Sequence, residues 1–351
     1  MAVSFSGGTP SIGNSKYYNG EIPFIRSAEI NSAITELYLT EEGLKNSSAK
    51  MVNVGDILYA LYGATSGEVG ISKINGAINQ AILAIKPYDA YNSKFIEQWL
   101  KNQKKNIIDK YLQGGQGNLS AAIVKKLLIP FPSLPEQTAI GDFFSTLDRS
   151  IALHQRELEN LKNRKKSLLQ KMFPKNGESV PKIRFPEFKN APAWEQRKLG
   201  EVAEITMGQS PNSAKYTNNP SDHILVQGNA DMRNGYVHPR VWTTQVTKTA
   251  KKGALIISVR APVGDVGKTE YNVVLGRGVA AIQGNEFIFQ LLSKMKINGY
   301  WEKLSTGSTF ESINSNDLKD ASISLPSLPE QTAIGDFFST LDRSIALHQR
   351  E

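Results

Sequence analysis

The stretch PSLPEQTAIGDFFSTLDRSIALHQRE occupies residues 132–157, and the same 26 letters return without change at residues 326–351. The first copy continues as LENLKNRKKSLLQKMF, and there is no proline between Glu136 and Phe173. From Ile140 to Met172 a set of mostly apolar positions advances by alternating steps of four and three, which is the spacing of a coiled-coil seam. The stretch therefore predicts one long helix with a continuous apolar stripe.

The ends of this helix are also encoded locally. Ser133 and Glu136 are spaced as a capping box, and Pro135 lies in the first turn, where its missing N–H costs no hydrogen bond. Pro174 followed by Gly177 indicates an end near Phe173. About 38 residues at 1.5 Å each make a rod of about 57 Å. A rod of that length with an apolar stripe needs a partner helix.

The second copy is the natural partner for the first. Identical seams from one chain can meet across a pseudo-two-fold axis, which predicts an antiparallel helix pair that holds two bodies at a fixed separation. The alternative, in which each helix packs on its own domain, stays open. The predicted seam positions are Phe144, Leu147, Ile151, His154, Leu158, Leu161, Phe338, Leu341, Ile345 and His348.

The regions before the two copies resemble each other. GDILYALYGATSGEVG at 55–70 aligns with GALIISVRAPVGDVG at 253–267, and short β-branched runs broken by Gly, Asn and Pro indicate strands, with one late helix in each region. The predicted fold class is α/β (α+β): two similar mixed domains joined by long helices that form an antiparallel coiled coil. The predicted segments are domain 1 at 1–130, helix 1 at 131–175, a linker at 176–203, domain 2 at 204–325 and helix 2 at 326–351; the late helices are expected at about 93–112 and 285–304.

One segment of the sequence occurs only once. Residues 158–203 have no counterpart beyond the second copy or before the first domain, so we expect two repeat units with one connector missing. Residues 158–175 of that connector carry six Lys or Arg against one Glu.

The length, net charge and cysteine content limit the classes of protein to which the chain can belong. A chain of 351 residues is long enough for two domains, and its net charge of +8 suits a polyanionic partner such as DNA or RNA, although many basic proteins bind no nucleic acid. The absence of cysteine excludes disulfides and cysteine-ligated zinc. Neither a signal peptide nor an apolar run of about 20 residues is visible, so we expect a soluble, cytoplasmic protein.

The segment Gly264-Asp265-Val266-Gly267-Lys268-Thr269 resembles a phosphate-binding loop but has Pro262 where the Walker pattern needs glycine. We interpret it as a hairpin turn. The segment 276–281 fits GxGxxA without a surrounding strand-turn-helix unit, so we interpret it as a loop.

No catalytic constellation is recognisable in the sequence. The four histidines form no HExxH or comparable ligand set, no serine stands in a GxSxG elbow, and no Asn-Pro-Pro-Tyr motif of adenine methyltransferases occurs. The sequence therefore predicts a binding protein without catalytic residues or a metal site.

Two variable domains, each followed by Pro-Ser-Leu-Pro-Glu-Gln and a long helix, resemble the specificity subunit of type I restriction-modification systems. The resemblance covers nearly the whole chain and is most specific at 128–173 and 323–351, with support from 180–202. It implies two target-recognition domains that read the halves of a bipartite double-stranded DNA site. It also implies that the helices dock two methyltransferase subunits, and that restriction subunits join the complex. S-adenosylmethionine, ATP and Mg²⁺ would then belong to those partners and not to this chain.

The comparison of the two domains suggests which residues contact DNA. Arg26 against Gln227, Tyr62 against Arg260, and Gln80 against Arg277 differ at equivalent turns, and Arg, Gln and Asn are side chains that read base edges. A solvated surface side chain is the alternative for each. The expected phosphate contacts are Lys16, Lys73, Lys215, Arg233 and Lys268, and polar loops after the late helices add Gln113, Gln116 and Ser308.

A second reading stays open: a truncated or silent variant of the same family that mediates subunit assembly without binding DNA.

Overall fold

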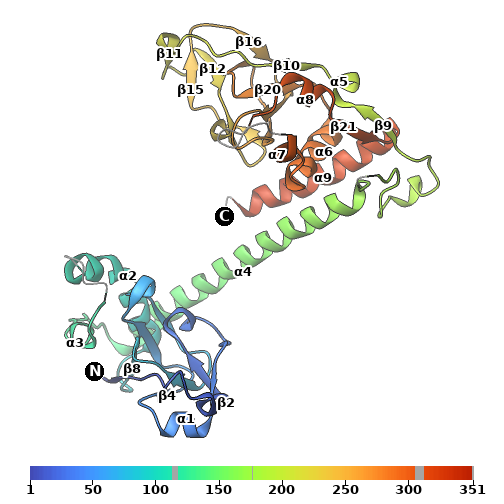
Figure 1. Cartoon of the computed structure of the whole chain (residues 1–351). Helices are drawn as coiled ribbons and strands as arrows, with labels where there is room; N and C mark the ends of the chain where they lie inside the picture. The colour runs from blue at the N-terminus through green and yellow to red at the C-terminus, as the bar shows by residue number, and fades with distance from the viewer. Residues whose placement is uncertain (113–117, 176, 305–311, 350–351) are drawn as a thin grey trace. The chain divides into compact units, whose positions relative to one another are not determined.

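We describe the protein from a computed structural model covering residues 1–112, 118–175, 177–304 and 312–349 (Figure 1). The chain forms two compact units, unit 1 at 1–153 and unit 2 at 154–351. Each unit is described by itself. The boundary between them lies inside α4 (Leu134–Met172), whose first half belongs to unit 1 and second half to unit 2.

Unit 1 contains two four-stranded sheets. The first has the strand order β1 (Ala2–Ser6), β8 (Ile82–Pro87), β5 (Ile57–Ala60), β6 (Val69–Ile71), and the second has the order β3 (Tyr38–Leu39), β2 (Tyr18–Ile25), β7 (Gly76–Ile78), β4 (Lys50–Val52). The helices are α1 (Glu41–Lys45), α2 (Ser93–Tyr111), α3 (Ala121–Lys125) and the first half of α4.

Unit 2 has two larger sheets and a short one. The first sheet has the order β10 (Ile205–Met207), β20 (Val279–Ile282), β17 (Leu255–Ser258), β18 (Val266–Lys268), β14 (Tyr236–Val237), β13 (Met232–Arg233). The second has the order β11 (Tyr216–Thr217), β15 (Val241–Thr243), β12 (His223–Val226), β19 (Val273–Leu275), β16 (Lys248–Ala250), and β21 (Ser322–Leu325) pairs with β9 (Glu195–Lys198). The helices are α5 (Leu199–Val202), α6 (Glu286–Ile297), α7 (Tyr300–Leu304), α8 (Ser315–Lys319), α9 (Leu328–His348) and the second half of α4.

The same strand order occurs in both units, which confirms the prediction of two similar mixed domains. β1-β8-β5-β6 corresponds to β10-β20-β17-β18, and β2-β7-β4 corresponds to β12-β19-β16. The unusual pairing is shared as well, because β2–β7 and β12–β19 are both parallel whereas their neighbours are antiparallel. The segment 264–269, interpreted from sequence as a hairpin turn, contains β18, which pairs antiparallel with β17.

The sequence of the central strand β5 is apolar because both faces of the strand are buried. Alternate side chains of a strand point to opposite faces of the sheet. Ile57 and Tyr59 pack in the cluster that includes Ile96 of α2, whereas Leu58 and Ala60 pack in a second cluster between the sheets. Both faces are covered, so the run is buried without alternation.

The late helix differs between the units. In unit 1 it is the single helix α2, close to the predicted range. In unit 2 the predicted helix is broken into α6 and α7, because Asn298 ends α6 and Gly299 takes the left-handed conformation with φ +66°.

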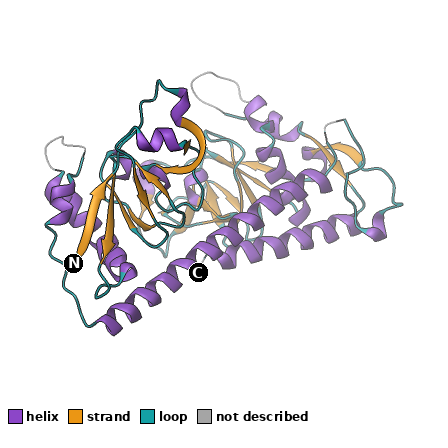
Figure 2. Ribbon diagram, turned by 90° about the horizontal axis from the view of Figure 1, so that it is seen from below, coloured by secondary structure: helices purple, strands orange, loops and turns teal. Residues whose placement is uncertain are grey.

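Within unit 2, the second half of α4 and α9 pack side by side and antiparallel (Figure 2). The rings of Phe173 and Phe338 are 6.2 Å apart, and Lys165 Nζ lies 2.6 Å from Asp342 Oδ1. At the other end, the rings of His154 and His348 are 6.4 Å apart. The residue numbers rise on one helix as they fall on the other, which confirms the predicted antiparallel pair.

The predicted pairing does not extend along the whole seam. In the first half of α4, the side chains of Phe144, Leu147 and Ile151 are 41%, 44% and 47% exposed. Within unit 2, α9 ends at His348, opposite His154, and lies against the second half of α4.

The segment predicted as a linker, 176–203, is folded into unit 2 wherever it is described. β9 pairs with β21 over four residues, and Trp194 and Leu199 are buried in the core of the unit. Arg184 forms a buried ion pair with Glu330 at 2.6 Å. Glu330 is the counterpart of Glu136, which was predicted to complete a capping box in the first copy. At the start of α9 the hydroxyl of Ser327 accepts no cap hydrogen bond.

Candidate nucleic-acid interface

Gln80 in unit 1 and Arg277 in unit 2 form one of the three predicted pairs of base-reading positions, and they lie at the same place in their units. In unit 1 the hydroxyl of Thr9 donates to Gln80 Oε1 at 2.7 Å, and in unit 2 the backbone N–H of Arg277 donates to Ser210 Oγ at 3.1 Å. Glycines let the backbones approach this closely: a Cβ on Gly7 would lie 1.8 Å from the carbonyl oxygen of Ile78. The alignment of Gln80 with Arg277 therefore reflects equivalent positions in the fold.

The second pair, Tyr62 and Arg260, follows the central strand of each unit. Tyr62 forms an isolated antiparallel bridge with Asn118, and Arg260 forms one with Ser312. The bridges tie the strand end to Asn118 and Ser312, which come directly after residues that the structure does not describe. Gln113, Gln116 and Ser308, which were predicted in those loops, lie outside the described residues.

The third pair lies next to a 3₁₀ turn that an acidic residue closes: Arg26 is the N-cap of one turn, and Gln227 comes just before Gly228, the N-cap of the other. Glu29 accepts the backbone N–H of Arg26 at 3.0 Å, and Asp231 accepts that of Gln227 at 2.7 Å. The side chains then differ. The Arg26 guanidinium donates to Glu29 at 2.8 Å and to Glu36 at 2.6 Å, so it would have to leave both carboxylates to reach a base.

The pKa of Glu29 is lowered in the folded protein. Its partial burial acts to raise the pKa, but hydrogen bonds from the side chain and backbone of Arg26, the backbone of Glu36 and the hydroxyl of Thr35 outweigh burial and lower the pKa of Glu29 to about 2. The carboxylate therefore stays ionised and holds the turn.

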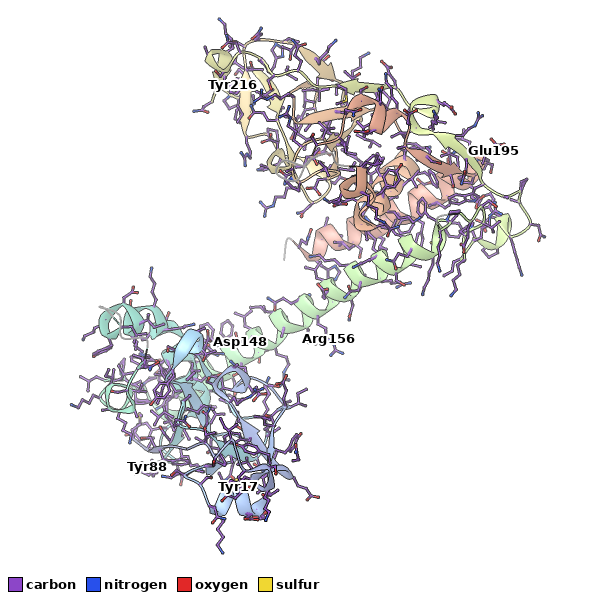
Figure 3. All side chains as sticks on the ribbon, viewed as in Figure 1. Tyr17, Tyr88, Asp148, Arg156, Glu195 and Tyr216 are labelled. Atoms are coloured by element: carbon purple, nitrogen blue, oxygen red, sulfur yellow. The ribbon has the colours of Figure 1, made fainter. Side chains whose placement is uncertain are left out.

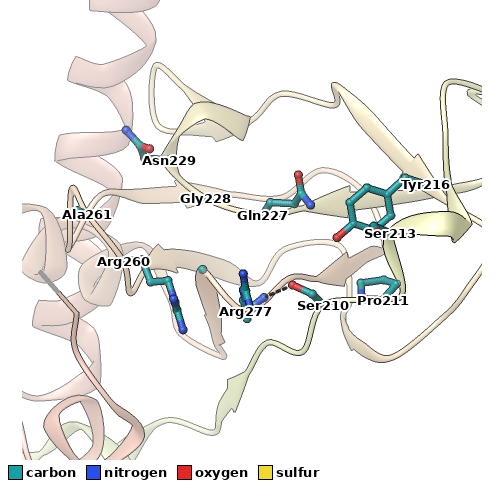
Figure 4. Close-up of a pocket in the computed structure, with 11 residues that line it drawn as sticks. Ser210, Pro211, Ser213, Tyr216, Gln227, Gly228, Asn229, Arg260, Ala261 and Arg277 are labelled. Carbon is teal, nitrogen blue, oxygen red and sulfur yellow. Dashed lines mark hydrogen bonds between the residues drawn. The ribbon is translucent and has the colours of Figure 1, made fainter. Parts of the chain in front are cut away.

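In unit 2 one member of each pair faces a single open cleft. Gln227, Arg260 and Arg277 line this cleft of about 460 Å³ (Figure 4). They come from three segments that are distant in sequence: the end of β12, the end of β17 and the β19–β20 turn. Two guanidinium groups and one amide at one opening form a donor-rich surface suited to base edges or phosphate oxygens.

Four polar side chains that were not predicted from sequence also lie at this cleft. Tyr216, Asn229, Ser210 and Ser213 line the same cleft. A usable signal existed only for Tyr216, an aromatic residue next to the predicted phosphate contact Lys215. An aromatic ring at such an opening can stack on a base.

The predicted phosphate contacts fall into two groups. Lys16 and Lys215 are exposed in equivalent 3₁₀ turns, each preceded by an Asn that caps the turn. Arg233 is exposed in the β13–β14 hairpin and lines a second groove of about 1010 Å³ with Lys162 and Lys166. These three cations remain accessible to a polyanion.

The other two predicted phosphate contacts are engaged within the protein. Lys73 Nζ donates to the carbonyl oxygen of Asn31 at 2.7 Å. Lys268 Nζ donates to Glu286 at 2.9 Å and lies over the ring of Phe289. Burial acts to lower the pKa of Lys268, but the hydrogen bond and charge of Glu286 outweigh it, so the pKa is raised.

The burial of the predicted seam residues depends on the helix that packs against them. In unit 2, Phe338 is fully buried, and Leu158, Leu161, Leu341, Ile345 and His348 are half-buried. In unit 1, the opposite side of α4 packs on α2. There Asp148 accepts hydrogen bonds from Gln98 at 3.0 Å and Lys101 at 2.9 Å. Figure 3 labels Asp148 on this half of the helix.

Across the residues that the structure describes, no cluster of three or more His, Asp or Glu side chains is arranged to hold a metal ion. None of the described helices is both long and apolar enough to cross a membrane.

Comparison with known proteins identifies the family. The family described as "Type I restriction modification DNA specificity domain" matches residues 3–163 and again 192–351, one match for each repeat. The chain belongs to this specificity family. Its two matches follow the internal repeat seen in the sequence.

Curated relatives agree with this assignment. The chain is 30% identical over 341 residues to a putative type I restriction enzyme MjaX specificity subunit of Methanocaldococcus jannaschii, covering 91% of this chain and 79% of the relative. It is 23% identical to the MjaVIII specificity subunit of the same organism, covering 96% and 86%.

A solved structure supports the fold. The S subunit of a type I restriction-modification system from M. genitalium superimposes with a TM-score of 0.67 at 16% identity, covering 99% of this chain and 89% of that one. At this identity the likeness concerns the fold alone.

Proposed function

We propose that the chain is the DNA-specificity subunit of a type I restriction-modification enzyme and that its two units read the two halves of a bipartite site. The observation that carries the proposal is the equivalence of Tyr62 with Arg260 and of Gln80 with Arg277: one scaffold presents different polar side chains at the same turns. Such an arrangement suits two different half-sites, because base identity is read by side-chain type at a fixed position.

The helix segments at 132–157 and 326–351 have the same sequence, which favours binding of two identical partner subunits. In this proposal they dock two methyltransferase subunits, and restriction subunits join through the assembled complex. Catalysis belongs to those subunits, which bind S-adenosylmethionine, ATP and Mg²⁺, and this chain supplies recognition. The donor-rich cleft of Gln227, Arg260 and Arg277 supports a binding role.

The test is a methylome measurement. Cells that express the chain with its methyltransferase partner are expected to carry methylated adenine or cytosine in a split sequence with an unread spacer. Replacement of Arg260 and Arg277 together by Ala should change or abolish only one half of that sequence. Methylation at a continuous, undivided site would contradict the proposal.

A second candidate is an assembly scaffold that holds DNA poorly. The exposed apolar side chains of Phe144, Leu147 and Ile151 favour it, because such a face is suited to protein contact. A mobility-shift series with the chain and methyltransferase subunits separates the two: a stable protein complex that never retains target DNA would support the scaffold.

A further inference from the structure

The larger groove of unit 2 carries positive charge that the protein itself does not neutralise. The groove has a volume of about 1010 Å³ and is lined by residues of the β13–β14 hairpin, α6, α9 and the second half of α4. Four of its lining cations are exposed: Lys162 and Lys166 of α4, Arg233 of the hairpin and Arg343 of α9. Among the described residues, none of the four side chains forms an ion pair or a hydrogen bond.

The half-buried carboxylates beside the groove are engaged with other groups. Lys165 pairs with Asp342 at 2.6 Å, and Lys268 pairs with Glu286 at 2.9 Å. The fully buried amide of Gln290 donates to both carboxylates, at 2.8 Å to Asp342 and at 3.0 Å to Glu286. Because these carboxylates hold the helices and the sheet together, they do not pair with the four exposed cations.

Two further acidic residues line the groove. Asp265 lies 4.0 Å from Lys296, which also pairs with Glu302 at 3.0 Å. Glu270 is exposed and forms no ion pair among the described residues. Four cations without a partner therefore line the groove together with one such carboxylate. A groove with this balance of charge attracts a polyanion.

The β13–β14 hairpin holds Arg233 in a fixed position at the groove. Its two-residue turn is Asn234-Gly235, with φ angles of +53° and +79°, and Asn-Gly is the pair that favours such a turn. The backbone N–H of Lys268 donates to the carbonyl oxygen of Gly235 at 2.8 Å, and β14 pairs in parallel with β18. In the corresponding sheet of unit 1 the described strands end at β6, so this hairpin is a feature of unit 2.

The spacing of the two lysines on α4 suits a row of phosphates. Lys162 and Lys166 are four residues apart, so they lie on the same side of the helix with a rise of about 6 Å between them. One DNA strand carries a charge about every 3.4 Å along the helix axis, so both lysines can contact one strand. Tyr236 and Tyr271 also line the groove, and tyrosine hydroxyls are common donors to phosphate oxygens.

The groove lies close along the chain to the cleft of Gln227, Arg260 and Arg277. Arg260 lines the cleft and Gly264 lines the groove, and both belong to the connection between β17 and β18. A duplex whose bases face the cleft would therefore have its backbone near the groove.

We propose that this groove binds the phosphate backbone of DNA beside the half-site that unit 2 reads, so that the long helix α4 contacts DNA through Lys162 and Lys166. The inference rests on the proposed function, because it takes duplex DNA as the ligand. The contact supplies affinity that is independent of sequence and sensitive to salt, since each neutralised phosphate releases counterions. Base identity remains the task of the cleft.

The test measures duplex binding by the complex of the full chain with methyltransferase subunits, using fluorescence anisotropy at several salt concentrations. The double variant Lys162→Ala/Lys166→Ala should reduce the slope of log binding constant against log salt by about two units, because each phosphate contact contributes about 0.9. Target and unrelated duplexes should lose affinity alike. The matched control is Arg164→Ala/Lys171→Ala, which removes the same charge from exposed positions of α4 outside the groove and should leave the slope nearly unchanged.

Phosphate ethylation interference locates the contact on the DNA. Ethylation of phosphates beside one half-site should weaken binding of the wild-type complex and should no longer matter for the Lys162→Ala/Lys166→Ala complex. Equal slopes for the wild type and this variant, or equal losses in this variant and its control, would overturn the inference and leave the proposed function standing. Failure of the variant to assemble in analytical ultracentrifugation would assign the groove to a protein contact and would overturn it too. A wild-type complex that retains no duplex DNA would contradict both the proposed function and this inference.

Discussion

Glu136 and Glu330 occupy the same position in two identical segments, yet Glu330 is 0% exposed and held by Arg184, whereas Glu136 is exposed to solvent. The difference arises from the chain that lies over each copy and not from the copies themselves. The chain therefore contains its own matched controls, in which one substitution can be compared at two positions of equal local sequence.

Glu330→Ala should lower the free energy of unfolding of unit 2 by about 3–5 kcal/mol, because it leaves the Arg184 guanidinium buried without its partner. Glu136→Ala removes an exposed carboxylate and should change stability by no more than about 0.5 kcal/mol. Differential scanning calorimetry of both variants checks the pair. Equal effects at the two positions would contradict the described burial.

Phe338→Ala should destabilise unit 2 by about 3–5 kcal/mol, since it leaves a cavity beside Phe173. Phe144→Ala removes a ring that is already 41% exposed and should cost much less. Urea unfolding followed by circular dichroism measures both. A large cost at Phe144 would show that another segment covers this part of α4 in solution.

The two-domain fold could be predicted from sequence because the chain repeats itself. Identical letters at 132–157 and 326–351, and the GEVG and GDVG pair, fix equivalent positions without any structure. The equivalence of Gln80 with Arg277 followed from the same alignment. These inferences needed only local pattern and comparison within one chain.

The remaining features depend on single contacts between distant residues. Trp194 and Arg184 lie in a segment rich in proline and charge that has no second copy and no periodicity, so nothing local shows that the segment folds onto α9. The engagement of Lys268 by Glu286 likewise depends on how α6 packs on β18. The local patterns of the sequence do not reveal which cations are already paired.

Arg277→Ala should relax the base preference of one half-site and cost about 1–3 kcal/mol at the affected base pair. Its backbone N–H bond to Ser210 should survive the change, so the turn should keep its shape. Arg277→Lys is the control, because it keeps the charge and loses the planar fork. Weakening of all sequences alike by Arg277→Ala would assign this residue to phosphate contact.

Lys215→Ala should reduce the slope of log binding constant against log salt by about one unit, with equal loss for target and unrelated DNA. Lys16→Ala in the equivalent turn of unit 1 should behave in the same way. Fluorescence anisotropy on the complex with methyltransferase subunits at several salt concentrations provides the measurement. A loss confined to the target sequence would instead indicate base reading.

Acid sensitivity of unit 1 should depend on Glu29. The pKa of this carboxyl is lowered from its ordinary value of 4.5 to about 2 in the folded protein, so its contribution to stability is complete above about pH 4.5 and is lost as the pH falls towards 2. Glu29→Gln should therefore flatten the fall of the unfolding temperature between pH 4.5 and pH 2. Arg26→Met, which removes the side-chain donor, should flatten the same limb. An unchanged acid limb in both variants would show that the Arg26–Glu29 contact does not hold the turn in solution.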